Sequence, residues 1–277
     1  MGERGAPADQ YDSPLGGLPS PSRVQLTLAR VEAASAEVRF VPNGYELTQE
    51  VGERIRRGLG ESLLPLLERA AINVVSVTIT PDGADQSVDT QHGWKFSSSD
   101  RSTAVSIMPA MVLVQTTRYE RFSVSFAPIL ARALELFTDE TNAELVQRIG
   151  LRYVNRLRDA DVHSPQDWVP RIRAPFAGTL SSDWSGLVEQ SLQATTLRLD
   201  ATAGARVQNG VIPEDGSELK YSYLVDIDVF REQTMPFNPS VCADHTRQLN
   251  RTALALFAQV LSPSYFNSLG PRREEAS

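Results

Sequence analysis

The residues best suited to chemistry are two rows of charged side chains on two predicted strands. Residues 144–158 form the first strand, whose alternate positions include Arg148, Arg152 and Arg156. Residues 219–230 form the second, in which Asp226 and Asp228 alternate with aliphatic residues. Successive side chains of a strand point to opposite faces, so each row occupies one face. A row of arginines could bind an oxyanion, and two carboxylates roughly 7 Å apart could form an acid/base or cation-binding pair.

Both rows also have simpler interpretations. The arginines and aspartates could pair with each other, within one chain or across a two-fold interface, or they could face solvent. Pairing across neighbouring strands would contribute only ~0.2–1 kcal/mol per pair. Pairing is the favoured interpretation, and a ligand site remains an alternative. Its candidate ligand-binding residues are Arg148, Arg152, Arg156, Asp226 and Asp228.

Several common chemistries lack their motifs in this chain. The sequence contains no phosphate-binding G-x-x-x-x-G-K-[ST] loop, no well-placed G-x-G-x-x-G and no G-x-S-x-G nucleophile elbow. Cys242 and His245 could share a helix face, but zinc needs about four ligands and nothing places His92 or His163 nearby. We therefore expect no catalytic residues, no metal site and no cofactor.

Composition and charge restrict the partners further. The 277 residues carry a formal net charge of -7, and an acidic balance disfavours broad binding to nucleic acids or anionic membranes. No apolar run approaches the ~20 residues of a membrane-spanning helix. One cysteine excludes an intrachain disulfide, and the N-terminus lacks an apolar signal core. We expect a cytoplasmic protein with no membrane partner.

The spacing of apolar residues predicts the fold class. Strands are predicted at residues 33–41, 73–80, 93–97, 102–108, 111–117, 144–158, 191–199, 205–211 and 219–230. Helices are predicted at residues 47–59, from near Leu63, at 126–137, 166–171 and 240–261, and at 265–269. The fold is therefore α+β, with antiparallel sheets and helices packed on one face.

Each half of the chain resembles a strand meander followed by a helix, which predicts two similar subdomains. Composition predicts a disordered tail at residues 1–25 and a charged tail at residues 271–277. The subdomains would then cover residues 26–158 and 159–270.

The run R-I-G-L-R-Y-V-N-R-L at residues 148–157 resembles a signature of a sporadically distributed, uncharacterised prokaryotic protein family. Four further runs occur in the matching order: V-E-A-A-S-A-E-V-R-F, G-W-K-F-S-S-S-D, L-V-D-I-D-V-F and L-N-R-T-A-L-A-L-F-A-Q-V-L-S-P. The resemblance covers about residues 28–270. It implies no known activity or catalytic residues, and its scattered distribution is similar to that of mobile or defence genes.

Three functional hypotheses follow. The first is a non-enzymatic binding or assembly protein that forms a homodimer or binds another protein, through a sheet face or edge. The second is an enzyme, or a nucleotide- or anion-sensing factor, that uses the arginine and aspartate rows. The third, from the family resemblance alone, is an accessory component of a phage-defence or toxin-neutralising system.

Overall fold

The computed structural model describes residues 11–20, 24–26, 31–80, 83–214 and 220–273. Its helices are α1 (Gln49–Leu59), α2 (Ala127–Thr141), α3 (Ala174–Ala177), α4 (Pro239–Val260) and α5 (Pro263–Ser268). Its strands are β1 (Val24–Leu26), β2 (Val31–Phe40), β3 (Leu66–Thr80), β4 (Gly83–Ser97), β5 (Thr103–Met108), β6 (Met111–Thr116), β7 (Leu145–Leu157), β8 (Ser191–Arg198), β9 (Ala203–Pro213), β10 (Tyr221–Pro236) and β11 (Pro271–Arg273). Four short helical segments lie between these elements: the π-helix η2 (Phe122–Phe126) and the 3-10 helices η3 (Pro165–Arg171), η4 (Gly178–Ser181) and η5 (Ser185–Leu187).

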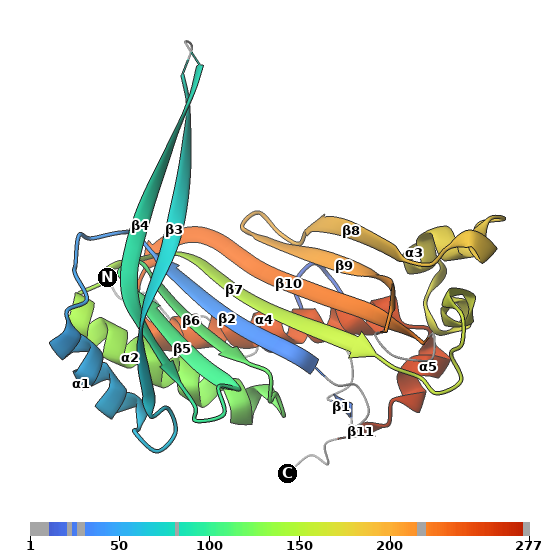
Figure 1. Cartoon of the computed structure of the whole chain (residues 1–277), viewed down its shortest axis with the longest axis horizontal. Coiled ribbons are helices and arrows are strands. Elements are labelled where there is room, and N and C mark those ends of the chain that lie inside the picture. Colours follow the sequence, from blue (N-terminus) through green and yellow to red (C-terminus); the bar gives the residue numbers. More distant parts are fainter. Residues whose placement is uncertain (1–10, 21–23, 27–30, 81–82, 215–219, 274–277) are drawn as a thin grey trace.

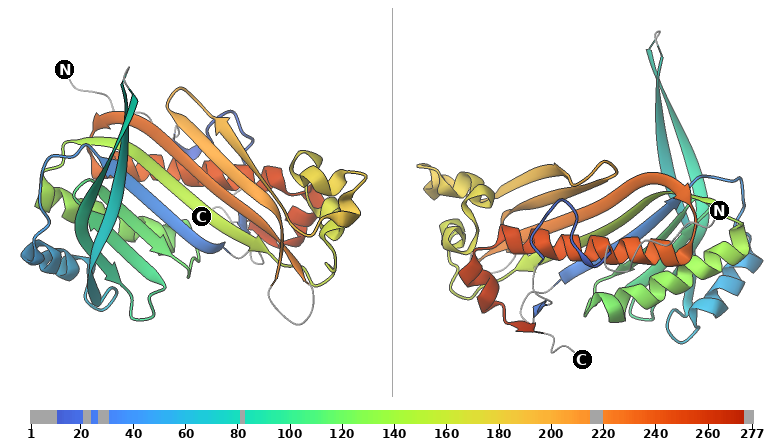
Figure 2. Two further views of the ribbon diagram at one scale, coloured as in Figure 1. Left: turned by 45° about the horizontal axis from the view of Figure 1, so that its top comes forward. Right: turned by 180° about the vertical axis from the view of Figure 1, so that it is seen from behind.

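Nine strands form one antiparallel sheet in the order β3-β4-β5-β6-β2-β7-β10-β9-β8. The helices α2 and α4 lie against one side of this sheet, with α1 beside α2, and the long β3–β4 hairpin rises on the other side (Figures 1 and 2). The predicted α+β class, with an antiparallel sheet, is therefore confirmed.

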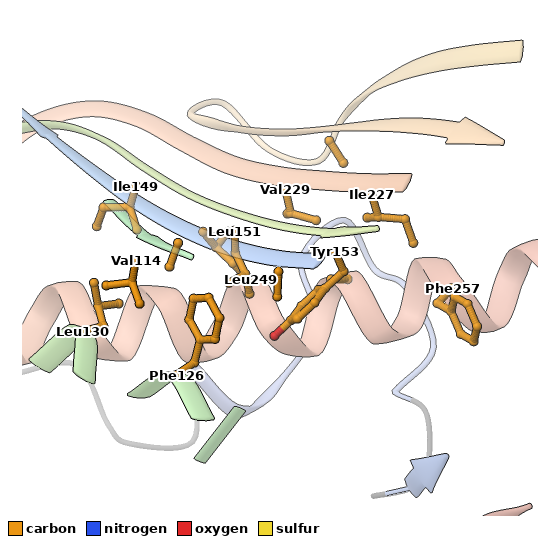
Figure 3. Close-up of a cluster of buried hydrophobic side chains, with 14 of the residues drawn as sticks. Val114, Phe126, Leu130, Ile149, Leu151, Tyr153, Ile227, Val229, Leu249 and Phe257 are labelled. Carbon is orange, nitrogen blue, oxygen red and sulfur yellow. The ribbon is translucent and has the colours of Figure 1, made fainter. Parts of the chain in front are cut away.

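The main core lies between the sheet and α4. Side chains from the middle strands point towards the helix, among them Ile149, Leu151 and Tyr153 of β7 (Figure 3). From the helix side, Leu249 and Phe257 are 1% and 4% exposed. Tyr153 also donates a hydrogen bond from its hydroxyl to Asn250 Oδ1 at 2.8 Å, which fixes α4 along the strand.

The sheet is continuous across the predicted subdomain boundary at residue 158. Strand β7 precedes that boundary, and it pairs with β10, which follows it, over twelve register positions from Tyr223↔Leu157 to Pro236↔Leu145. On its other side β7 pairs with β2. The division into two subdomains stays a prediction, and any such units share one sheet.

One predicted helix is wrong. Residues 66–80 form β3, not a continuation of a helix from near Leu63, and β3 pairs with β4 from Leu66↔Ser97 to Thr80↔Gly83. The run L-L-E-R-A-A has high helix propensity, but pairing with a neighbouring strand outweighs propensities of a few tenths of a kcal/mol per residue.

The chain termini also differ from the predicted tails where they are described. Leu15 is 8% exposed and its backbone N–H donates to Thr252 Oγ1 of α4 at 3.0 Å. Residues 11–20 therefore pack on α4, whereas disorder was predicted through residue 25. Residues 271–273 form β11, which pairs with β1. Residues 1–10, 21–23 and 274–277 of the two predicted tails lie outside the described residues.

Candidate functional site

The register of β7 decides which side chains face the helices. Ile149, Leu151 and Tyr153 are 1%, 0% and 7% exposed, as the period-two alternation predicts, and they face α4 (Figure 3). The alternation fails at the start of the strand, where Val146 is buried and Leu145 is 38% exposed. The pairing with β2 skips Gln147, since Arg39 pairs with Arg148 and Phe40 with Val146. This β-bulge shifts the faces by one residue, so strict period-two alternation gives the wrong side there.

Arg148 lies flat along the opposite face of the sheet. A Cβ at Gly150 would stand 2.5 Å from Arg148 Nη1, so the glycine leaves space for the guanidinium. The guanidinium sits 5.0 Å from the centre of the Phe230 ring and donates to Glu37 Oε1 at 2.7 Å and to Asp228 Oδ2 at 3.3 Å. Its side chain is only 17% exposed. Its Nε lies 3.3 Å from Glu232 Oε1, so Arg148 is held by three carboxylates and a ring within the chain.

Arg152 and Asp226 form a two-point ion pair. Arg152 donates from Nε to Oδ1 at 2.8 Å and from Nη2 to Oδ2 at 2.6 Å. The side chain of Asp226 is 11% exposed, whereas that of Arg152 is 53% exposed. Arg152 is therefore anchored at one edge of its guanidinium and reaches solvent with the rest.

Asp228 lies where burial disfavours its ionised form. Burial raises its pKa, the Glu37 and Asp226 carboxylates raise it further, and Arg148 and Arg152 oppose the shift. Arg152 lies directly opposite Asp228 in the register, yet it bonds Asp226 instead. Asp228 is left to share Arg148 with Glu37.

Arg156 completes the row. It donates from Nε to Ser222 Oγ at 2.8 Å, and the same nitrogen is 3.0 Å from Glu214 Oε1. The structure thus brings all five predicted residues to one face, where the arginines pair with acidic or hydroxyl groups of neighbouring strands. Of the alternatives, pairing within one chain is the one observed, and Arg152 is the one arginine of the row with half its side chain exposed.

A cavity of about 300 Å³ opens beside Arg152 on this same face, over β2, β5 and β6. Its floor is made of small side chains, including Ala33, Ser35 and Ala104. The lining contains three cationic side chains, Lys95, Arg101 and Arg152, and no carboxylate. Of these three, the sequence predicted a role for Arg152 alone.

The run G-W-K-F-S-S-S-D positions Lys95. A Cβ at Gly93 would stand 2.2 Å from the Ile107 carbonyl oxygen, so only glycine allows this close approach of β5. Trp94 Nε1 donates to the carbonyl oxygens of Leu47 and Thr48, both at 3.0 Å, which ties β4 to the start of α1. With Trp94 in the core, Lys95 must point to the opposite face, where it lines the cavity.

The turn after β4 positions Arg101. The Asp100 carboxylate accepts hydrogen bonds from the hydroxyls of Ser98 and Ser102, each at 2.7 Å, and these bonds lower the pKa of Asp100. Arg101 adopts a left-handed backbone with φ 58°, and its guanidinium forms a two-point pair with Glu68 at 2.7 and 3.2 Å. The sequence contained one clue to this cavity: Lys95 is one of only two lysines in the chain.

The opposite end of the sheet carries an exposed edge and apolar side chains. Strand β8 is the last in the sheet and pairs with β9 alone among the described strands. The structure shows six exposed large apolar side chains among the described residues, and three of them lead into or lie on β8: Trp184, Leu187 and Leu192, at 55%, 82% and 43%. Exposed apolar groups beside a free strand edge are typical of interaction surfaces.

The described residues contain no group of three or more His, Cys, Asp and Glu side chains arranged to hold a metal ion. Cys242 is buried, which raises the pKa of its thiol to about 12. At neutral pH this thiol is therefore protonated and is a poor nucleophile or metal ligand.

The comparisons with known proteins assign no family. No family model matches the chain, and no curated protein matches it. Among solved structures, the S. pombe Pct1 RNA triphosphatase in complex with the Spt5 CTD aligns with 9% identity over 93% of this chain and 88% of that chain. Its TM-score of 0.12 is too low to carry an argument about fold or function. Within the described residues, none of the helices is both long enough and apolar enough to cross a bilayer.

Proposed function

We propose that this chain is a cytoplasmic, non-enzymatic binding and assembly protein that forms a homodimer through the free edge of β8. The observation that carries the proposal is the free edge together with the exposed side chains of Trp184, Leu187 and Leu192 beside it. Resemblance to the sporadically distributed family stays a prediction and contributes nothing to this argument.

The composition of β8 favours pairing with another strand. Its sequence, S-L-Q-A-T-T-L-R, contains no proline, and its only charged residue is the terminal Arg198. Natural edge strands usually avoid pairing by means of lysines, prolines, bulges or a covering segment. The register of β8 with β9 runs without interruption from Ser191↔Val211 to Arg198↔Gly204, so the strand has no bulge in this pairing.

A second copy of the chain fits this edge by symmetry. An antiparallel strand pair can be its own two-fold mate, because each strand offers the same donors and acceptors to the other. With the axis through Ala194, Leu192 lies opposite Thr196 of the partner subunit and Arg198 lies opposite the uncharged Gln190 of the partner subunit. No like charges then face each other.

Sedimentation of the wild-type chain at micromolar concentration tests the proposal. We expect a dimer of the 30.5 kDa chain that dissociates on dilution. The double variant Leu192→Lys with Thr196→Lys places lysine opposite lysine twice, so it should sediment as a folded monomer whose melting temperature no longer depends on concentration.

A second double variant at the same two positions is the matched control. Leu192→Lys with Thr196→Glu places opposite charges across the two-fold axis, so the dimer should be retained. Val124→Lys, at an exposed apolar residue away from β8, should also leave the dimer intact. A wild-type monomer throughout the concentration range, or a dimer that tolerates both lysines, would overturn the proposal.

A further inference from the structure

We propose that the cavity beside Arg152 binds a small phosphate ester. The proposal is independent of the β8 edge, which lies at the other end of the sheet. It rests on the shape of the cavity, on the three cationic side chains around it and on the fixed positions of two of them.

The shape follows from the register of four strands. One row of paired residues crosses the strands β5, β6, β2 and β7. Its members, in that order, are Ala104, Gln115, Ser35 and Arg152. Three steps between strands at about 4.8 Å each give this row a length of roughly 14 Å. Because Ser35 within the row and Ala104 at its β5 end have small side chains, the space above the strands stays open, and a cavity of about 300 Å³ results. That volume corresponds to the lower end of small-molecule sites, about 300–1,000 Å³.

The charges stand at the two ends of the row. Arg152 closes the β7 end, while Lys95 on β4 and Arg101 in the turn between β4 and β5 stand at the other. Between them the lining offers the neutral hydroxyls and amide of Ser35, Ser102, Gln115 and Thr117. A ligand with a charged group and a polar body would therefore meet cations at its ends and hydrogen-bonding groups along its length.

The two arginines are already held in place. Asp226 binds Nε and Nη2 of Arg152, and Glu68 binds both terminal nitrogens of Arg101. A guanidinium has five N–H donors, so each arginine keeps donors for a ligand after its carboxylate is satisfied. Side chains that are ordered before binding lose less entropy when the ligand arrives, which favours affinity.

Lys95 supplies the unbalanced positive charge. It is partly buried and forms no ion pair within 4.0 Å among the described residues. Glu68 lies opposite it in the register, but that carboxylate bonds Arg101, and Asp226 bonds Arg152, so three cations share two carboxylates. Beside it, the buried hydroxyl of Ser97 lacks a hydrogen-bond partner in the described part of the chain, and its register partner is the cavity residue Ala104. The cavity is net positive although the chain has a net charge of -7. Because the protein as a whole does not attract anions, the local positive charge points to a specific anionic ligand.

Isothermal titration calorimetry at low salt tests this site with four probes: inorganic phosphate, pyrophosphate, ribose 5-phosphate and citrate. We expect saturable binding of one molecule per chain for ribose 5-phosphate, weaker binding of inorganic phosphate, and weakening of both with added salt. Citrate or pyrophosphate binding more tightly than ribose 5-phosphate would overturn the assignment to a phosphate ester.

Variants locate the binding to the cavity. Lys95→Gln should weaken ribose 5-phosphate binding by about tenfold or more, because a charge-assisted hydrogen bond is lost. Thr117→Glu places a carboxylate at an exposed position of the lining, and it should weaken binding without disturbing the fold. Arg206→Gln is the control, because Arg206 is exposed, shares the face of Arg152 through the register of Asp228, and does not line the cavity.

Three results would overturn the proposal: no saturable binding with any of the four probes, full affinity in both Lys95→Gln and Thr117→Glu, or an equal loss in Arg206→Gln. The last result would indicate attraction to the charged face as a whole. Melting curves of each variant show whether it is folded, and Thr117→Glu keeps the test decisive if Lys95→Gln is unstable.

Discussion

Arg152 bonds the carboxylate of Asp226, although Asp228 is the residue directly opposite it in the register. The diagonal partner allows two parallel N–H···O bonds, which is the strongest geometry available to an arginine and a carboxylate. Arg156 makes the same diagonal choice, since it lies opposite Leu224 and bonds Ser222. Two arginines of the row thus bond diagonal partners, whereas Arg148 also pairs with Glu232, which lies directly opposite it.

The Arg152–Asp226 pair should contribute modestly to stability, because Arg152 is half exposed. We expect Arg152→Ala and Asp226→Asn each to cost about 1 kcal/mol in the free energy of unfolding. A double-mutant cycle by urea denaturation should show a coupling energy of at least ~0.5 kcal/mol. Purely additive effects would contradict the observed two-point bond.

Asp228 should behave differently from Asp226. Burial raises its pKa, so the ionised carboxylate opposes folding as pH rises through and above its unfolded value, near 4. Asp228→Asn removes that penalty, and the variant should gain stability relative to wild type between about pH 3 and pH 6. Denaturation midpoints measured across this range test the sign. A relative loss with rising pH would show that Arg148 and Arg152 outweigh burial at this position.

Gly150 should matter through Arg148. Gly150→Ala would place its Cβ 2.5 Å from Arg148 Nη1 and displace a guanidinium that bonds Glu37 and Asp228. We expect a cost of about 1–2 kcal/mol, because hydrogen bonds to charged groups are lost.

In an Arg148→Ala background, the same Gly150→Ala substitution should cost little. Gly186→Ala is the matched control, since a Cβ there meets nothing within 4 Å. A full penalty at Gly150 in the absence of Arg148 would mean that backbone freedom, and not the guanidinium, is the reason for the glycine.

The bulge at Gln147 predicts an unusual pair of effects. Val146→Asp should unfold the chain or cost more than about 3 kcal/mol, because it buries an unpaired charge at a residue of 0% exposure. Leu145→Asp should be tolerated, since Leu145 is 38% exposed. Strict alternation from Ile149 predicts the reverse order. Melting temperatures of the two variants distinguish these registers.

Local patterns predicted the elements well where one physical signal dominates. Alternation over Ile149, Leu151 and Tyr153 gave the buried face of β7, and four-residue spacing from Val51 to Leu59 gave α1. Local sequence gave the wrong element from Leu66 onwards, where helix propensity favours a helix but pairing with β4 produces a strand. The propensity of a segment is local, whereas its pairing depends on residues far along the chain.

The site was harder to predict than the elements. The charge rows could be read from the sequence, but the diagonal partners depend on the twist of the sheet, which no single strand encodes. Lys95 and Arg152 are 57 positions apart in the printed sequence, and four successive strand pairings, from β4 to β7, bring them to one cavity. Gly150 gave no signal as a site residue, because its role is to leave space for Arg148.

Helix α4 follows all nine strands of the large sheet in the sequence, which has a consequence during synthesis. Strand β2 bonds β7 across 111 residues, as the Glu37–Arg148 pair shows, and the helix that covers both strands begins only at Pro239. A growing chain therefore presents the apolar side of a nearly complete sheet before its cover leaves the ribosome. We expect chains that stop before Pro239 to aggregate or to be bound by chaperones. Once α4 has left the ribosome, it can cover the apolar side of the sheet and prevent aggregation.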